Sequence, residues 1–102
     1  MLSYELTKDA EADLEEIIRY TTLTWGLEQA ERYFKNLQRC FNKIGTRQDT
    51  RKSFHKHLPQ AFVVPCEHHY VFYLLPKQSK PQIIAVFHER MDLMHRLKER
   101  FE

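Results

Sequence analysis

The chain has 102 residues, of which 16 are Lys or Arg and 14 are Asp or Glu, so its formal net charge is +2. This length fits one domain over residues 1–102. The composition, with 42% hydrophobic, 13% aromatic and 29% charged residues, excludes a disordered chain, a collagen-like repeat and a disulfide-rich scaffold.

The first predicted element is a short, half-buried strand, because residues 2–6 alternate between apolar and polar side chains. Thr7 follows as an expected N-cap, and acidic residues lie close behind it. Apolar side chains at helical spacing then predict an amphipathic helix over about residues 8–24.

A second stripe of apolar side chains predicts a helix over about residues 27–44. Gly26 and Gly45 follow the two helical patterns, and both are expected as left-handed residues that end a helix. Because so few residues separate the helices, they should fold back into an antiparallel hairpin that needs a sheet to cover its apolar face.

Beyond this hairpin, residues 46–52 are polar and basic, which predicts a loop. Three strands, rich in β-branched and aromatic residues and bounded by prolines, are predicted at residues 61–64, 69–75 and 82–87. The middle strand is apolar on both faces and should lie centrally. With a short helix at residues 91–101, the sequence predicts an α+β fold: a helical hairpin on a small antiparallel sheet, in β-α-α-β-β-β order.

No apolar run approaches the roughly 18 residues that a membrane span needs, and the N-terminal residues are acidic, unlike those of a secretory signal. A cytoplasmic protein without membrane contact is therefore expected. In that compartment Cys40 and Cys66 should be reduced thiols.

Histidines are the candidate acid–base groups or metal ligands, at His55, His57, His68, His69, His88 and His95. His55 and His57 would share one face of a strand, but the sequence identifies no third ligand, so neither a metal nor another cofactor is expected. His68 and His69 are expected at the end of a turn. The basic residues 47–57 favour a solvated loop over a phosphate-binding patch, so direct nucleic-acid binding is not expected.

The sequence resembles the ParE branch of the ParE/RelE toxin superfamily over nearly the whole chain. The matching residues, in chain order, are Ala10, Asp13, Leu14, Ile17, Tyr20, Trp25, Gly26, Ala30, Tyr33, Pro65, Val71, Phe72, Tyr73 and residues 86–92, V-F-H-E-R-M-D. The fold of that family, a helical hairpin on an antiparallel sheet, is also the fold that the periodicities predict.

This resemblance implies the toxin of a bacterial type II toxin–antitoxin pair, neutralised by a ParD-like antitoxin. ParE members are associated with inhibition of DNA gyrase, whereas RelE members cut messenger RNA in the ribosome. The positions that match the strand cations of RelE-type nucleases hold Ala61, Val63 and Tyr70, and the terminal tyrosine position holds Arg96. Because RNA cleavage needs a base, an acid and cations, the sequence favours a gyrase inhibitor and no catalytic residue.

Two alternatives remain open. A ribosome-dependent mRNA endonuclease could use histidines, with His55, His57, His69 and His88 as candidates, because imidazole titrates near neutral pH. The second alternative is a module that binds an antitoxin but is not toxic.

Two groups of site residues are predicted. Contacts to the target are assigned to His88, Arg90, Asp92, Arg96, Lys98 and Arg100. Their basic side chains should stay in solvent while Leu93, Leu97 and Phe101 anchor the C-terminal helix, although Asp92 could instead cap that helix and His88 could bond within the fold. Contacts to the antitoxin are assigned to an exposed apolar groove with Trp25, Tyr33, Phe62 and Val64.

Overall fold

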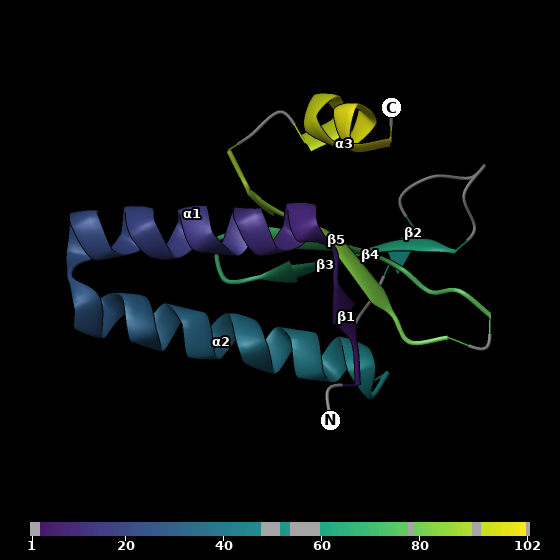
Figure 1. Cartoon of the computed structure of the whole chain (residues 1–102), viewed down its shortest axis with the longest axis horizontal. Helices are drawn as coiled ribbons and strands as arrows, with labels where there is room; N and C mark the ends of the chain where they lie inside the picture. The colour runs from purple at the N-terminus through teal and green to yellow at the C-terminus, as the bar shows by residue number, and fades with distance from the viewer. Residues whose placement is uncertain (1–2, 48–51, 54–59, 78, 91–92, 102) are drawn as a thin grey trace.

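The computed structural model describes residues 3–47, 52–53, 60–77, 79–90 and 93–101 (Figure 1). Its elements are β1 (Glu5–Leu6), α1 (Lys8–Trp25), α2 (Leu27–Gly45), β2 (Lys52–Ser53), β3 (Ala61–Cys66), β4 (His69–Leu74), β5 (Gln82–His88) and α3 (Leu93–Phe101). The predicted α+β class and element order are confirmed. One short strand, β2, lies where the sequence predicted the end of a loop.

The strands form one sheet in the order β1-β5-β4-β3-β2, so β4 lies at its centre, as its two apolar faces predicted. The pairs β2–β3, β3–β4 and β4–β5 are antiparallel. β1 instead joins β5 in parallel, and it covers that strand only at Gln82 and Ile83. β1 therefore leaves the edge of β5 beyond Ile83 uncovered.

Helices pack on both faces of the sheet. One core contains Leu14 of α1, Leu37 and Phe41 of α2, and Val71 and Tyr73 of β4. The other contains Phe72, Phe87 and Leu97, and the last of these belongs to α3. Since alternate strand residues face opposite sides, α3 covers the face that the hairpin leaves open. In Figure 1 it lies above α1, on the side away from α2.

The predicted helix ends are partly confirmed. Thr7 caps α1, because its side chain accepts a hydrogen bond from the Ala10 N–H at 3.2 Å. Gly26 has φ 95° and separates the two helices, as predicted. The prediction for Gly45 is wrong, because Gly45 is the last residue of α2 and the left-handed residue is Arg47, with φ 60°. Gly45 instead allows Ser3 to approach, since a Cβ there would lie 2.8 Å from Ser3 Cβ.

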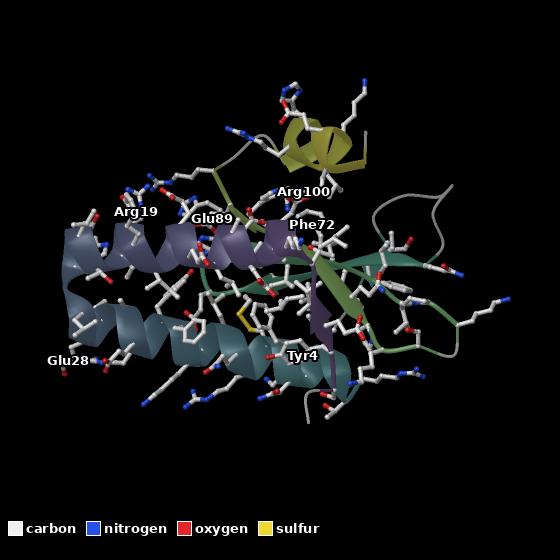
Figure 2. All side chains as sticks on the ribbon, in the orientation of Figure 1. Tyr4, Arg19, Glu28, Phe72, Glu89 and Arg100 are labelled. Atoms are coloured by element: carbon white, nitrogen blue, oxygen red, sulfur yellow. A yellow bond between two sulfur atoms is a disulfide. The ribbon has the colours of Figure 1, made fainter. Side chains whose placement is uncertain are left out.

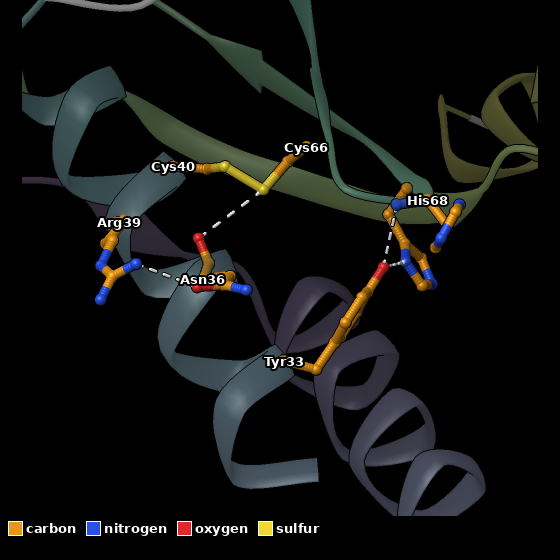
Figure 3. Close-up of a disulfide and its surroundings, with 7 residues drawn as sticks. Tyr33, Asn36, Arg39, Cys40, Cys66 and His68 are labelled. Carbon is orange, nitrogen blue, oxygen red and sulfur yellow. Dashed lines mark hydrogen bonds between the residues drawn. A yellow bond between two sulfur atoms is a disulfide. The ribbon is translucent and has the colours of Figure 1, made fainter. Parts of the chain in front are cut away.

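Cys40 of α2 and Cys66 of β3 form a disulfide, with their Cα atoms 6.3 Å apart (Figure 3). The expectation of two reduced thiols is therefore wrong. It relied on the compartment inferred from composition, whereas the packing of α2 on β3 brings these two side chains together although 26 positions separate them. Among the helices that the structure describes, none is long and apolar enough to cross a membrane.

Candidate functional site

A cavity of about 680 Å³ opens between the helical hairpin and the C-terminal end of β5. The helical wall contains the apolar and aromatic residues Ile17, Tyr20, Trp25 and Tyr33 together with polar ones, among them Asp13 and Glu16. The strand wall combines the apolar residues Val86 and Phe87 with the polar or basic residues His68, His69, His88 and Arg90. The two walls come from segments far apart in sequence, so the cavity exists only in the folded chain.

The tip of the hairpin, where α1 ends and α2 begins, carries four large apolar side chains in solvent. They are Tyr20, Leu23, Trp25 and Leu27, with exposures of 64, 79, 70 and 65%. Tyr20 and Trp25 also line the cavity, so this hairpin tip and the cavity form one continuous apolar surface. A continuous exposed apolar surface on a small domain is typical of a protein-binding site.

The polar centre of the cavity is a hydrogen-bonded group formed by Tyr33 of α2 and two adjacent histidines (Figure 3). The Tyr33 hydroxyl accepts from the backbone N–H of His68 at 3.1 Å and lies 2.5 Å from His69 Nδ1. His68 Nδ1 lies 3.2 Å from Glu89 Oε1. The ring of His69 packs edge-on against that of His88, with centroids 5.1 Å apart. His69 begins β4 directly after a turn, as predicted.

Burial controls the protonation of this group. His69 is only 9% exposed, and its burial, together with the nearby His88 and His68, lowers its pKa from 6.5 to about 4. Burial also raises the pKa of Tyr33. At neutral pH both groups are therefore uncharged, and the contact between them joins two neutral partners.

The pKa of His69 predicts a loss of stability on acidification. Between about pH 6.5 and pH 4 the unfolded chain binds a proton at His69 that the folded chain does not, so the free energy of unfolding should fall as the pH decreases through this range. The charged or titratable groups around the ring are Tyr33 from α2, His88 from β5 and the neighbours His68 and Glu89.

Urea unfolding at pH 7 and pH 5 measures this effect. His69→Asn, which cannot titrate, should lose less stability between the two pH values than the unmodified protein. An equal loss in both proteins would assign the acid sensitivity to other groups.

The structure gathers only part of the predicted target-binding set. His88 and Arg90 line the cavity, and His88 Nδ1 accepts from the Arg90 backbone N–H at 3.1 Å. Arg96 and Lys98 are exposed on α3, as expected. Leu97 is buried, which confirms its anchoring role. Asp92 and the side chains of Leu93 and Phe101 lie outside the described residues.

For Arg100, the expectation of a solvated side chain is wrong. Its guanidinium lies between α3 and α1 (Figure 2), and the side chain is only 20% exposed. It contacts Asp13 through two hydrogen bonds of 3.1 and 3.2 Å and donates to the Ile84 carbonyl at 2.7 Å. It also stacks over the Phe87 ring, 5.0 Å from its centroid. Arg100 is therefore a packing residue.

Asp13 is the partner of Arg100, and the sequence did not predict this pairing. Besides Arg100, its carboxylate accepts from the Val86 N–H at 3.0 Å. The available signal was its position, since Asp13 falls three residues after Ala10 and four before Ile17, inside the apolar stripe of α1. An acidic residue in such a stripe needs a buried partner.

The predicted antitoxin-binding set is also divided. Trp25 and Tyr33 line the cavity, whereas Phe62 and Val64 lie on β3 and do not. Val64 is buried in the core, so its expected exposure is wrong, and half-buried Phe62 packs against Tyr73 with ring centroids 5.7 Å apart. The faces of β3 could not be told apart because several consecutive residues of that strand are apolar.

Within the described ranges, no three His, Cys, Asp or Glu side chains gather in a group that could hold a metal ion. His55 and His57, the pair considered for such a site, lie outside those ranges.

Comparison with known proteins assigns the family. A family model described as the ParE toxin of the type II toxin–antitoxin system parDE matches residues 4–93. The chain is 42% identical over 103 residues to Toxin ParE of Escherichia coli, covering 100% of this chain and 99% of that protein. It is 29% identical over 90 residues to Toxin ParE1 of Mycobacterium tuberculosis, covering 88% and 92%.

The fold has a counterpart in a solved structure described as the chromosomal ParDE TA system from P. aeruginosa. The TM-score is 0.68 at 18% identity, and the match covers 86% of this chain and 96% of that one. The chain therefore belongs to the ParE toxin family of type II toxin–antitoxin systems.

Proposed function

We propose that this ParE toxin inhibits DNA gyrase in the cytoplasm and is neutralised by a ParD-like antitoxin that occupies the cavity and covers the hairpin tip. The observation that supports antitoxin binding is the continuous apolar surface formed by Tyr20, Trp25 and the cavity wall. A partner that buries this surface would gain hydrophobic free energy and shield exposed aromatic side chains.

The side chains favour gyrase inhibition over RNA cleavage. Ala61, Val63 and Tyr70 supply no cation on the sheet. His69 is a poor general acid at neutral pH because burial lowers its pKa to about 4, and its Nδ1 is already bonded to Tyr33. The histidine-dependent endonuclease is therefore the less favoured alternative.

The target contact is assigned to Arg96 and Lys98, since both are exposed on α3 and neither pairs with a carboxylate of the described residues. Replacing both with alanine should weaken inhibition of gyrase supercoiling about tenfold, the equivalent of about 1.4 kcal/mol of binding. The thermal midpoint should change little, because exposed charges contribute under about 1 kcal/mol to stability.

The matched control is Lys35→Ala with Arg39→Ala, which removes the same charge from the exposed side of α2. Unchanged inhibition by a folded Arg96/Lys98 variant would contradict the assignment of the contact. Failure of the unmodified chain to inhibit supercoiling would contradict the gyrase proposal itself, and ribosome-dependent mRNA cleavage would then identify the endonuclease. Absence of both activities, with an antitoxin still bound, would identify the non-toxic module.

A further inference from the structure

One nitrogen of a buried cavity residue, Nε2 of His69, makes no hydrogen bond within the part of the chain that the structure describes. His69 lines the cavity at 9% exposure, and its Nδ1 is engaged by Tyr33. Its other ring nitrogen, Nε2, makes no hydrogen bond to the residues that the structure describes. A buried polar atom left in this way loses its hydration without compensation unless a ligand or water supplies the missing partner.

The hydrogen bonds around Tyr33 determine whether Nε2 of His69 is a donor or an acceptor. The Tyr33 oxygen accepts the His68 N–H, and its own hydrogen is satisfied when it points to His69 Nδ1. Nδ1 is then the acceptor of a neutral imidazole, and the ring proton lies on Nε2. Because the pKa of His69 is about 4, this neutral form persists at physiological pH. His69, which lines the cavity, thus carries a fixed N–H donor.

We propose that His69 Nε2–H is the anchor of this cavity for a carboxylate, an Asp or Glu side chain of the antitoxin. The inference rests on the proposed function, because it assigns the chemistry of the segment that occupies the same cavity. The stem of that side chain and its apolar neighbours would pack against Ile17, Tyr20 and Trp25.

Charge favours a carboxylate over other acceptors. Arg90 lines the same cavity, is exposed, and has no ion pair with the rest of the described chain, so an anion would gain a second favourable contact. The acidic lining residues Asp13 and Glu16 are already paired, with Arg100 and Arg19 respectively. A neutral carbonyl would satisfy His69 but leave Arg90 without a partner, and a lysine would meet a donor at His69.

Two substitutions of His69 distinguish the roles of its two ring nitrogens. The Asn side-chain oxygen of His69→Asn can replace Nδ1 as the acceptor for Tyr33 but supplies no donor near Nε2. The amide of His69→Gln reaches further and keeps an N–H near the position of Nε2. The Asn variant should therefore lose the anchor, and the Gln variant should retain most of it.

Binding of 3-phenylpropionate, measured by NMR titration, tests the anchor without the antitoxin. We expect at least about tenfold weaker binding to His69→Asn than to the unmodified protein or His69→Gln, and no such difference for the neutral 3-phenylpropanol. Equal binding of the carboxylate by folded unmodified protein and His69→Asn would overturn the proposal. Amide spectra report whether each variant is folded.

A double-mutant cycle with the antitoxin encoded beside the gene identifies the occupant. One Asp or Glu of the antitoxin should lose about tenfold in affinity when changed to Asn or Gln, and this loss should disappear in His69→Asn. Antitoxin binding without such a coupled acidic residue would overturn the anchor and leave the proposed function intact. If the antitoxin does not bind but the carboxylate probe depends on His69, the proposed function fails and the carboxylate site stands.

Discussion

Replacing Cys40 and Cys66 together with alanine should lower the free energy of unfolding by about 3 to 4 kcal/mol, the chain-entropy value for a loop closed across 26 positions. For a domain of this size, that loss corresponds to a decrease of roughly 15 to 25 °C in the thermal midpoint. The bridge restricts the unfolded chain, and in the folded chain it ties α2 to the end of β3 close to the turn that carries His68.

Thermal unfolding with and without dithiothreitol tests this effect directly. The reductant should lower the midpoint of the unmodified protein to near that of the double alanine variant, and it should leave the variant unchanged. If dithiothreitol does not affect the unmodified protein, the bridge is not part of the folded state in solution.

Loss of the bridge also affects the proposed partner. A reduced toxin would retain less stability of its own, so binding of an antitoxin to the folded form would contribute a larger share of the total. The difference in thermal midpoint between free and bound toxin should then be greater under reducing conditions. Tyr33 and Cys40 both lie on α2, so the bridge and the cavity share one supporting helix.

Local patterns predicted the elements of this fold because each depends on neighbours in sequence. The apolar residues on both faces of the strand around Tyr70 and Val71 identified the central strand, and Thr7 identified the start of α1. The prediction for Gly45 was wrong because glycine serves two purposes: it ends helices, and it lets two backbones approach closely. Only the position of Ser3 distinguishes these purposes, and that position is a property of the tertiary fold.

The candidate site was predicted less well because its contacts join distant segments. Trp25 and His88 were each identified, but for different partners, and the structure places them on one cavity. Arg100 was predicted to lie in solvent because helical spacing places it on the polar side of α3. Helical spacing does not show that α1, with Asp13, lies against that side. Its partner Asp13 lies 87 positions away, beyond the reach of any periodicity.

The edge of β5 that β1 leaves unpaired explains why the ion pair between Arg100 and Asp13 should contribute to stability. β1 pairs with β5 only as far as Ile83. The next edge groups are satisfied by side chains, since the Ile84 carbonyl accepts from Arg100 and the Val86 N–H donates to Asp13. The ion pair thus takes the place of a neighbouring strand, and it covers backbone groups that would otherwise be available for strand addition.

Arg100→Met should therefore lower the free energy of unfolding by about 2 to 3 kcal/mol. Breaking a fully buried pair costs about 3 to 5 kcal/mol, and the lower value allows for side chains that remain 20% and 18% exposed. Asp13→Asn should cost less, because the amide oxygen can still accept from Val86. The double variant should be more stable than the sum of the single effects predicts, since neither charge is then left without its partner.

Urea unfolding of the four proteins measures these values, and Arg96→Met is the matched control because it changes an exposed arginine of the same helix. That control should cost under about 0.5 kcal/mol. If Arg100→Met costs no more than Arg96→Met, the guanidinium does not hold α3 on the sheet, and packing of Leu97 against Phe72 and Phe87 must attach the helix. A large loss for Arg100→Met with strong coupling to Asp13 would instead assign Arg100 to folding and leave Arg96 and Lys98 as the free cations of α3.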